Sequence, residues 1–299
     1  IANVGLPTLA EAFGASFQEV QWIVLAYLLA STVSIVSVGR LGDVVGRRRL
    51  LVGGLILFTA GATLCGAAPT LWFLVAARAV QGLGAASMMA LAMAFVGDTV
   101  AAARTGSAMG LLGTMSAVGT ALGPSLGGVL IAVFSWRALF LVNLPFGLAT
   151  LYLAYRYLPA DRSGKADGGP FDKKGTLLLA LMLTAYALSM TIGRGATAIT
   201  LLSAAIIGGG VLIRVEARAP APLIRLATLR NPELSAGFAM SALVATVVMA
   251  TLVVGPFYLS DALGLGAAEV GLVMSVGPAV AALSGIPAGR LVDRFGAGT

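Results

Sequence analysis

Nine stretches without a charged residue constrain the fold of this chain more than any other feature. Their bounds are 20–39, 50–77, 79–97, 105–136, 138–155, 175–193, 195–213, 234–260 and 270–289. Each is about 18 residues or longer, the length at which an α-helix crosses a bilayer core of about 30 Å. Only helices and closed barrels satisfy their backbone polar groups in lipid, and these stretches lack the polar-apolar alternation of barrel strands. The sequence therefore predicts an all-α polytopic membrane protein.

Composition agrees with this class. Apolar residues make up 59% of the 299 residues and charged residues only 10%. A soluble domain is about 45–50% apolar and about 25% charged. We place ten membrane segments, the first of them a stub, at 1–11, 20–39, 50–67, 71–97, 105–131, 137–158, 175–193, 196–214, 234–259 and 268–289. A polar, glycine-rich linker over residues 159–174 separates the sixth segment from the seventh.

Basic residues gather in alternate loops. All 19 Lys and Arg residues fall on one side of the predicted segments except Arg78, Arg137 and Arg194. This bias follows the positive-inside rule and predicts that the basic loops face the cytoplasm. Topology explains the net charge of +7, so we expect the lipid bilayer as a partner and no nucleic acid. With Cys65 as the single cysteine and no histidine, we expect neither a disulfide framework nor a metal site.

One charged motif occurs twice. Residues 39–51 read GRLGDVVGRRRLL, and residues 289–299 read GRLVDRFGAGT, in the same register. An even number of predicted segments separates the copies, which puts both on the same face of the membrane. Two segments of similar design precede each copy. The sequence therefore predicts a duplicated helical bundle, an arrangement established for transporters.

The repeated motif resembles the loop signature between the second and third spans of the major facilitator superfamily. Five further stretches are similar to motifs of that family and follow in the same order: NVGLP at 3–7, LVAARAVQGLGAA at 74–86, GTALGPSLGGVL at 119–130, SWRALFLVNLPFG at 135–147 and PLIRLATLRNPELSAGFA at 222–239. A twelve-span member would have six spans between the two copies. The two additional segments therefore resemble the fourteen-span drug:proton antiporter branch.

This resemblance implies a domain organisation. Residues 1–158 would form an N-terminal six-span bundle whose first span is truncated. Residues 159–232 would hold cytoplasmic linkers and two extra central spans, at about 175–193 and 196–214. Residues 233–299 would be the first two spans of a C-terminal bundle, with four further spans missing.

Arg78 lies inside a predicted segment. An arginine that faces lipid is costly, so we expect Arg78 to face the bundle interior or a water-filled cavity, with Gln81 on nearly the same helical face. One interpretation is a buried arginine that ties helices together through backbone carbonyls. The family resemblance implies another, a role in proton coupling. Proton-coupled members commonly carry an acidic residue shortly before the stretch that corresponds to residues 3–7, and we find no acidic residue at mid-depth in the segments present.

The motif at 39–51 combines arginines with one acid. Its arginine run fits ordinary topology anchors, but Asp43 is hardly needed for orientation, because acidic residues contribute little to the positive-inside rule. Asp43 can pair with Arg40 or Arg47, or lie at the positive end of a helix. The resemblance implies a cytoplasmic gate that holds the bundles closed. We assign to this gate Gly39, Arg40, Asp43, Gly46, Arg47, Arg48, Gly289, Arg290, Asp293 and Gly296.

A glycine pattern marks the fifth segment. Gly119, Gly123 and Gly127 recur at intervals of four, and Pro124 removes a backbone donor. Close helix packing is the simple interpretation. With Gly128, the pattern also resembles the fifth-span signature of antiporters in this superfamily, for which we predict a kinked, close-packed helix that lets two bundles rock without a leak.

The sequence says least about the substrate and about catalysis. Candidates for an apolar substrate pocket are Tyr27, Asn143, Phe146 and Phe257, although such residues more often pack between helices or anchor at the membrane interface. The GLGAAS run at 82–87 lacks the preceding strand of a dinucleotide-binding loop. We therefore expect no enzyme and no cofactor.

Our first hypothesis is a proton-coupled exporter of hydrophobic or amphipathic compounds in the bacterial inner membrane, working by alternating access. Its partners would be lipid, protons and a small hydrophobic substrate, with a periplasmic adaptor as a candidate partner in a Gram-negative host. The alternatives are a metabolite uptake facilitator or symporter of the same superfamily, and a membrane receptor or scaffold that transports nothing.

Overall fold

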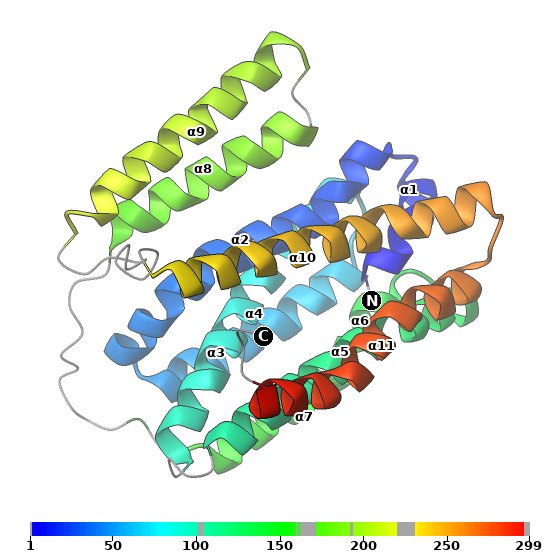
Figure 1. The fold of residues 1–299 in the computed structure, drawn as a ribbon. Helices are drawn as coiled ribbons and strands as arrows, with labels where there is room; N and C mark the ends of the chain where they lie inside the picture. Colours follow the sequence, from blue (N-terminus) through cyan, green and yellow to red (C-terminus); the bar gives the residue numbers. More distant parts are fainter. Residues whose placement is uncertain are drawn as a thin grey trace. The chain divides into compact units, whose positions relative to one another are not determined.

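The computed structural model describes residues 2–100, 105–159, 161, 172–191, 194–219 and 231–295, and all regular elements in these ranges are helices (Figure 1). In chain order they are η1 (Ala2–Gly5), α1 (Leu6–Phe13), α2 (Phe17–Val45), α3 (Arg47–Gly66), α4 (Leu71–Thr99), α5 (Thr105–Val133), α6 (Ala138–Leu141), α7 (Asn143–Tyr157), α8 (Lys173–Thr191), α9 (Ala196–Glu216), α10 (Pro232–Phe257), η4 (Tyr258–Ala262) and α11 (Ala267–Phe295). Eight helical stretches in the described part are long and apolar enough to cross a membrane. The predicted all-α membrane fold is confirmed.

The helices follow the predicted segments but differ at their ends. α2 begins before the predicted start at residue 20, because Ser16 and Glu19 form a capping box. The Ser16 amide donates to the Glu19 carboxylate at 2.8 Å, and the Glu19 amide donates to Ser16 Oγ at 3.4 Å. At its other end α2 continues to Val45, so residues 40–45, which we expected in a loop, are helical. The uncharged stretch that predicted this segment ends before Arg40. The backbone first leaves the helical conformation at Gly46, where φ is 103°.

The chain divides into two compact units that are not consecutive in sequence. One comprises Ile1–Ala12, Phe95–Leu139 and Val248–Thr299, and the other Phe13–Ala94 and Phe140–Val247. These units do not correspond to the bundles expected from the family resemblance, whose boundaries stay a prediction.

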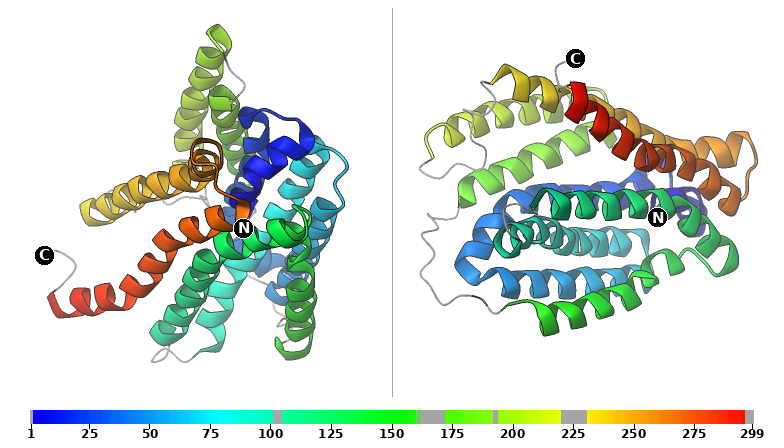
Figure 2. Two further views of the ribbon diagram at one scale, coloured as in Figure 1. Left: turned by 90° about the vertical axis from the view of Figure 1, so that its right-hand side faces the viewer. Right: turned by 60° about the horizontal axis from the view of Figure 1, so that its bottom comes forward.

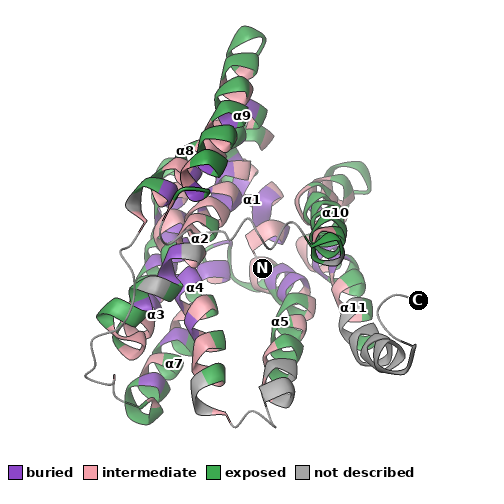
Figure 3. Cartoon of the chain, turned by 60° about the vertical axis from the view of Figure 1, so that its left-hand side comes forward, coloured by how far each residue is buried: buried purple, intermediate pink, exposed green. Residues whose placement is uncertain are grey.

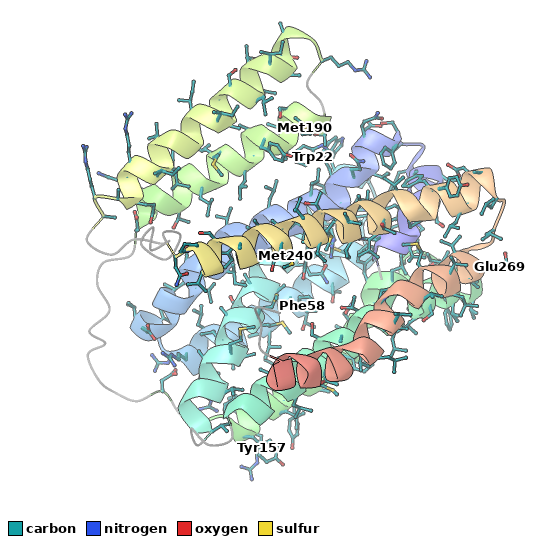
Figure 4. All side chains as sticks on the ribbon, viewed as in Figure 1. Trp22, Phe58, Tyr157, Met190, Met240 and Glu269 are labelled. Carbon is teal, nitrogen blue, oxygen red and sulfur yellow. The ribbon has the colours of Figure 1, made fainter. Side chains whose placement is uncertain are left out.

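The larger unit is built on α2, α3 and most of α4. Buried residues are frequent on α2 and α4 and scarce on α10 (Figure 3). α8 and α9 pack side by side as a helical hairpin, which Figures 1 and 2 show from three directions. α8 also packs on α2, where the hydroxyls of Ser37 and Thr176 lie 2.9 Å apart. Trp22 near the start of α2 and Tyr157 at the end of α7 are labelled in Figure 4.

The smaller unit contains η1, α5 and α11. Val4 of η1 packs with Val270 and Met274 of α11 in a buried cluster, to which partly buried leucines add, namely Leu252, Leu259 and Leu265. The start of α11 is fixed by Glu269, whose carboxylate accepts the Gly266 amide at 2.9 Å (Figure 4). α5 and α11 are in extensive contact along this unit.

Candidate functional site

Arg78 is the centre of a buried polar cluster on α4. Only 8% of its surface is exposed. Its Nε donates to the backbone carbonyl of Ile23 on α2 at 3.0 Å, and its Nη1 donates to Oε1 of Gln81 at 2.6 Å. The guanidinium carbon lies 4.2 Å from the centre of the Tyr27 ring and 6.0 Å from that of Phe140. The structure thus buries Arg78 between α4 and α2 and brings it together with Gln81.

Two glycines allow α4 to lie close enough to its neighbours for these bonds. A Cβ added to Gly82 of α4 would collide with the carbonyl oxygen of Tyr27 on α2. A Cβ added to Gly61 of α3 would lie 2.9 Å from the backbone of Gln81. Such close backbone approach is typical of small residues in membrane helices. It brings Arg78 within reach of the Ile23 carbonyl and leaves Gln81 fully buried.

The partners of Arg78 within the described ranges are a carbonyl, an amide and aromatic rings, all of them neutral. The buried charge is therefore stabilised by dipoles and by the face of an aromatic ring. This geometry fits the interpretation of an arginine that ties helices together, because it joins α4 to α2. Its role in proton coupling stays a prediction.

Tyr27 has a place that the sequence did not reveal. In the structure its ring lies against the Arg78 guanidinium, and its expected role in a substrate pocket stays a prediction. The available signal was its spacing, since Tyr27 follows Ile23 by one helical turn on α2, the helix whose carbonyl Arg78 binds. Cys65 also reaches this cluster, with its Sγ 4.0 Å from Oε1 of Gln81.

The other three pocket candidates lie elsewhere. Asn143 begins α7, and its Nδ2 donates to the carbonyl of Phe140 at 3.1 Å. Phe146 has 67% of its surface exposed. Phe257 is half-buried at the end of α10 and belongs to the smaller unit. A role in substrate binding stays a prediction for these side chains.

The gate motif forms the turn between α2 and α3. Gly46 alone separates the two helices. Asp43 in the last turn of α2 pairs with Arg47, the first residue of α3: its Oδ1 accepts from Nη2 at 2.9 Å and from Nε at 3.0 Å. Of the partners considered for Asp43, the structure shows Arg47, while the side chain of Arg40 lies outside the described part of the chain. The pair is solvent-accessible, and such pairs contribute about 0–1 kcal/mol.

Asp161, which the sequence analysis missed, binds the turn between α2 and α3. Its Oδ1 accepts the Arg48 amide at 2.8 Å, and its Oδ2 accepts the Arg49 amide at 3.2 Å. These are N–H groups that the first turn of a helix leaves without an intrahelical acceptor. Gly46 has no side chain to cap them, and a Cβ there would collide with the Asp161 carboxylate. Asp161, in a distant loop, thus accepts the hydrogen bonds that an N-cap side chain next to the helix usually accepts.

Arg48 adds a second connection from the same turn. Its Nη2 donates to the backbone carbonyl of Tyr155 near the end of α7 at 2.5 Å, and its guanidinium lies 5.5 Å from the centre of the Tyr155 ring. The start of α3 is therefore bound both to α7 and to Asp161. One sequence gives no signal for contacts between residues more than 100 positions apart, because the local pattern of residues does not determine how one helix packs against another.

The remaining gate residues are only partly described. Gly39 is exposed in α2. Gly289, Arg290 and Asp293 lie within α11. The side chains of Arg40, Arg290 and Asp293 lie outside the described part of the chain, as does the whole of Gly296.

The glycine-rich part of α5 contacts α11. Gly123, Pro124, Gly127 and Gly128 are buried, whereas Gly119 is exposed with open space around it. A Cβ on Gly271 of α11 would meet the carbonyl of Pro124 and lie 3.1 Å from Cα of Gly128. The two backbones therefore touch at Pro124 and Gly128, and the burial of Gly123 and Gly127 agrees with the expected close packing.

Comparison with known proteins decides the family. The sequence model of the Major Facilitator Superfamily matches residues 1–299. The chain belongs to this superfamily. It is 32% identical to the riboflavin transporter RibZ of Clostridioides difficile, over 99% of this chain and 65% of that protein. It is 31% identical to the multidrug resistance protein Stp of Mycobacterium tuberculosis, over 99% of this chain and 56% of that protein.

A third relative, the multidrug transporter protein MdtP of Bacillus subtilis, is 28% identical over 99% of this chain and 55% of its own length. The chain thus spans between about half and two thirds of the length of these superfamily members. Membership agrees with the helical membrane fold, and two of these three relatives are named as transporters.

Proposed function

We propose that the full-length protein is a proton-coupled secondary transporter that exports hydrophobic or amphipathic compounds across the bacterial inner membrane by alternating access. The observation that carries this proposal is the buried Arg78 cluster in a chain of the Major Facilitator Superfamily, because intramembrane charge commonly marks ion or substrate pathways. The names of Stp and MdtP support drug export among similar proteins. The α8–α9 hairpin supports the fourteen-span branch.

Arg78 would couple protons to helix movement through its fixed positive charge. A carboxylate brought near the cluster is attracted to the guanidinium when ionised and much less when protonated. Protonation of that acid would then favour a different arrangement of α2 and α4. The Asp43–Arg47 pair and Asp161 would hold the cytoplasmic gate, where a small energy suffices because two nearly balanced states need only a slight bias.

A second candidate is uptake or export of a metabolite. It is favoured by the 32% identity to a protein named as a riboflavin transporter. A planar, hydrogen-bonding solute of that kind would need polar groups in the pocket, and the described helices offer Gln81 and Asn143 as amides.

One transport assay separates these candidates. The full-length protein is expressed in bacteria that lack their own pumps, and accumulation of lipophilic cations, neutral drugs and riboflavin is measured with and without a protonophore. Reduced accumulation that the protonophore restores supports proton-coupled export. Unchanged accumulation of all compounds contradicts export, and a change confined to riboflavin supports the second candidate.

The Arg78→Ala variant tests the site in the same assay. We expect transport to be lost while the protein remains in the membrane, because no other side chain of the cluster carries a positive charge. Arg194→Ala, at an exposed arginine before α9, is the matched control and should transport normally. Near-normal transport by Arg78→Ala would return Arg78 to a purely structural role.

A further inference from the structure

A backbone amide of α5 donates its hydrogen bond to a side chain of α11. Pro124 lies inside α5, has no N–H and prevents the carbonyl one turn earlier from bonding normally. The next amide, that of Ser125, donates to Oγ of Ser275 at 2.9 Å. The Ser275 hydroxyl in turn donates to the carbonyl of Gly271 in its own helix at 2.9 Å. Within lipid, a neighbouring hydroxyl of this kind is what makes a proline kink tolerable.

This bond is part of a crossing at which the two backbones touch. A Cβ on Gly128 would collide with the carbonyl of Ala267, and a Cβ on Gly271 would collide with that of Pro124. Ser275 lies one helical turn beyond Gly271, on the same face of α11. Close backbone contact and a single directional bond together define one relative position of the helices, because a slide along either axis would break the bond and separate the glycines.

The crossing lies away from the basic loops. It occupies the second half of α5 and the first third of α11, whereas Arg104 precedes α5 and the second copy of the charged motif ends α11. By the positive-inside rule this is the non-cytoplasmic half of the membrane. α5 and α11 also belong to different bundles in the predicted domain organisation. Separation of the two helices here would therefore open the side opposite to the Asp43–Arg47 turn.

We propose that Ser275 is a positioning residue of the transport cycle, whose hydroxyl holds α5 next to Pro124 against α11 and so stabilises the state closed on the non-cytoplasmic side. The bond must break when that side opens. This inference rests on the proposed function only in assuming alternating access, and it names a residue that acts through helix position, without contact to substrate.

Three substitutions separate the bond from other effects. Ser275→Ala removes the acceptor of the Ser125 amide. Ser275→Thr keeps a hydroxyl at the same position. Ser125→Ala is the matched control, because the Ser125 hydroxyl bonds to the Leu122 carbonyl within α5, while the backbone amide that Ser275 binds is retained.

The measurement is the distance between spin labels on the full-length protein, with cysteines placed at the exposed positions Phe134 and Leu263 in a background that includes Cys65→Ser. We expect Ser275→Ala to raise the ratio of separated to close helices about threefold, the size typical of an interhelical hydrogen bond in a membrane. Ser125→Ala should match the parent, and Ser275→Thr should restore most of the close population.

The proposal is overturned if Ser275→Ala leaves the distance distribution unchanged, or if Ser125→Ala shifts it as much. Because the distances need no substrate, the result is independent of drug export. A shift in Ser275→Ala without export of any compound would contradict the proposed substrate class and support the role of Ser275. Export by the parent without a shift in Ser275→Ala would do the reverse.

Discussion

Tyr27 places an aromatic face against a buried charge, the guanidinium of Arg78. A desolvated cation held in this way gains about 2 kcal/mol. The two hydrogen bonds to Ile23 and Gln81 use the edge of the guanidinium plane, which leaves its face for the ring. Lysine has a point charge and no such plane, so arginine is the residue that suits this position.

We expect Tyr27→Phe to be close to wild type, because it keeps the ring and loses only the hydroxyl. Tyr27→Leu should lower the free energy of unfolding by about 1–2 kcal/mol, since it removes the aromatic face from a desolvated cation. Thermal unfolding of the full-length protein in detergent measures the difference. Equal stability of the two variants would mean that the ring contributes only apolar packing.

At the scale of elements, hydropathy located the helices and failed at their junctions. Length and absence of charge sufficed for the eight helical stretches of the described part that are long and apolar enough to cross a membrane, because a bilayer imposes both. The α2–α3 turn was predicted as a loop of several residues, yet a single glycine makes it. Asp161 and Ser275 were missed because each accepts hydrogen bonds from a helix that is far from it in the sequence. No local pattern around an acid in a linker, or around a serine in an apolar stretch, identifies such a distant partner.

The junction between α2 and α3 gives a prediction at the same scale. Asp161→Ala should destabilise the protein by about 1 kcal/mol, the usual loss for an N-cap, because the Arg48 and Arg49 amides lose their acceptor. Asp161→Asn keeps one carbonyl oxygen and should lose less. Unfolding in detergent measures both, and Asp261→Ala at an exposed acid is the control. Full stability of Asp161→Ala would show that water replaces this cap.

At the scale of the molecule, the proposed fourteen-span topology adds an even number of helices, which would preserve sidedness. In that topology α8 and α9 would cross the membrane out and back, so the chain would enter α10 on the face from which it entered α8. A single added span would invert everything that follows, including the second copy of the charged motif. Many large apolar side chains of these helices are exposed, among them Ile206 and Ile207. In a bilayer such surface faces lipid, which is as apolar as the side chains themselves.

This topology predicts where reporters fused to the chain will be active. An alkaline phosphatase folds only outside the cytoplasm, so we expect high activity for fusions after residues 136 and 194 and low activity after residues 104 and 218. A fluorescent protein fused at the same positions should give the opposite pattern and controls for expression. The basic loops set this orientation, because translocating several Lys and Arg residues is unfavourable. High phosphatase activity after both 194 and 218 would mean that α9 does not cross the membrane, and the two-helix insertion would be wrong.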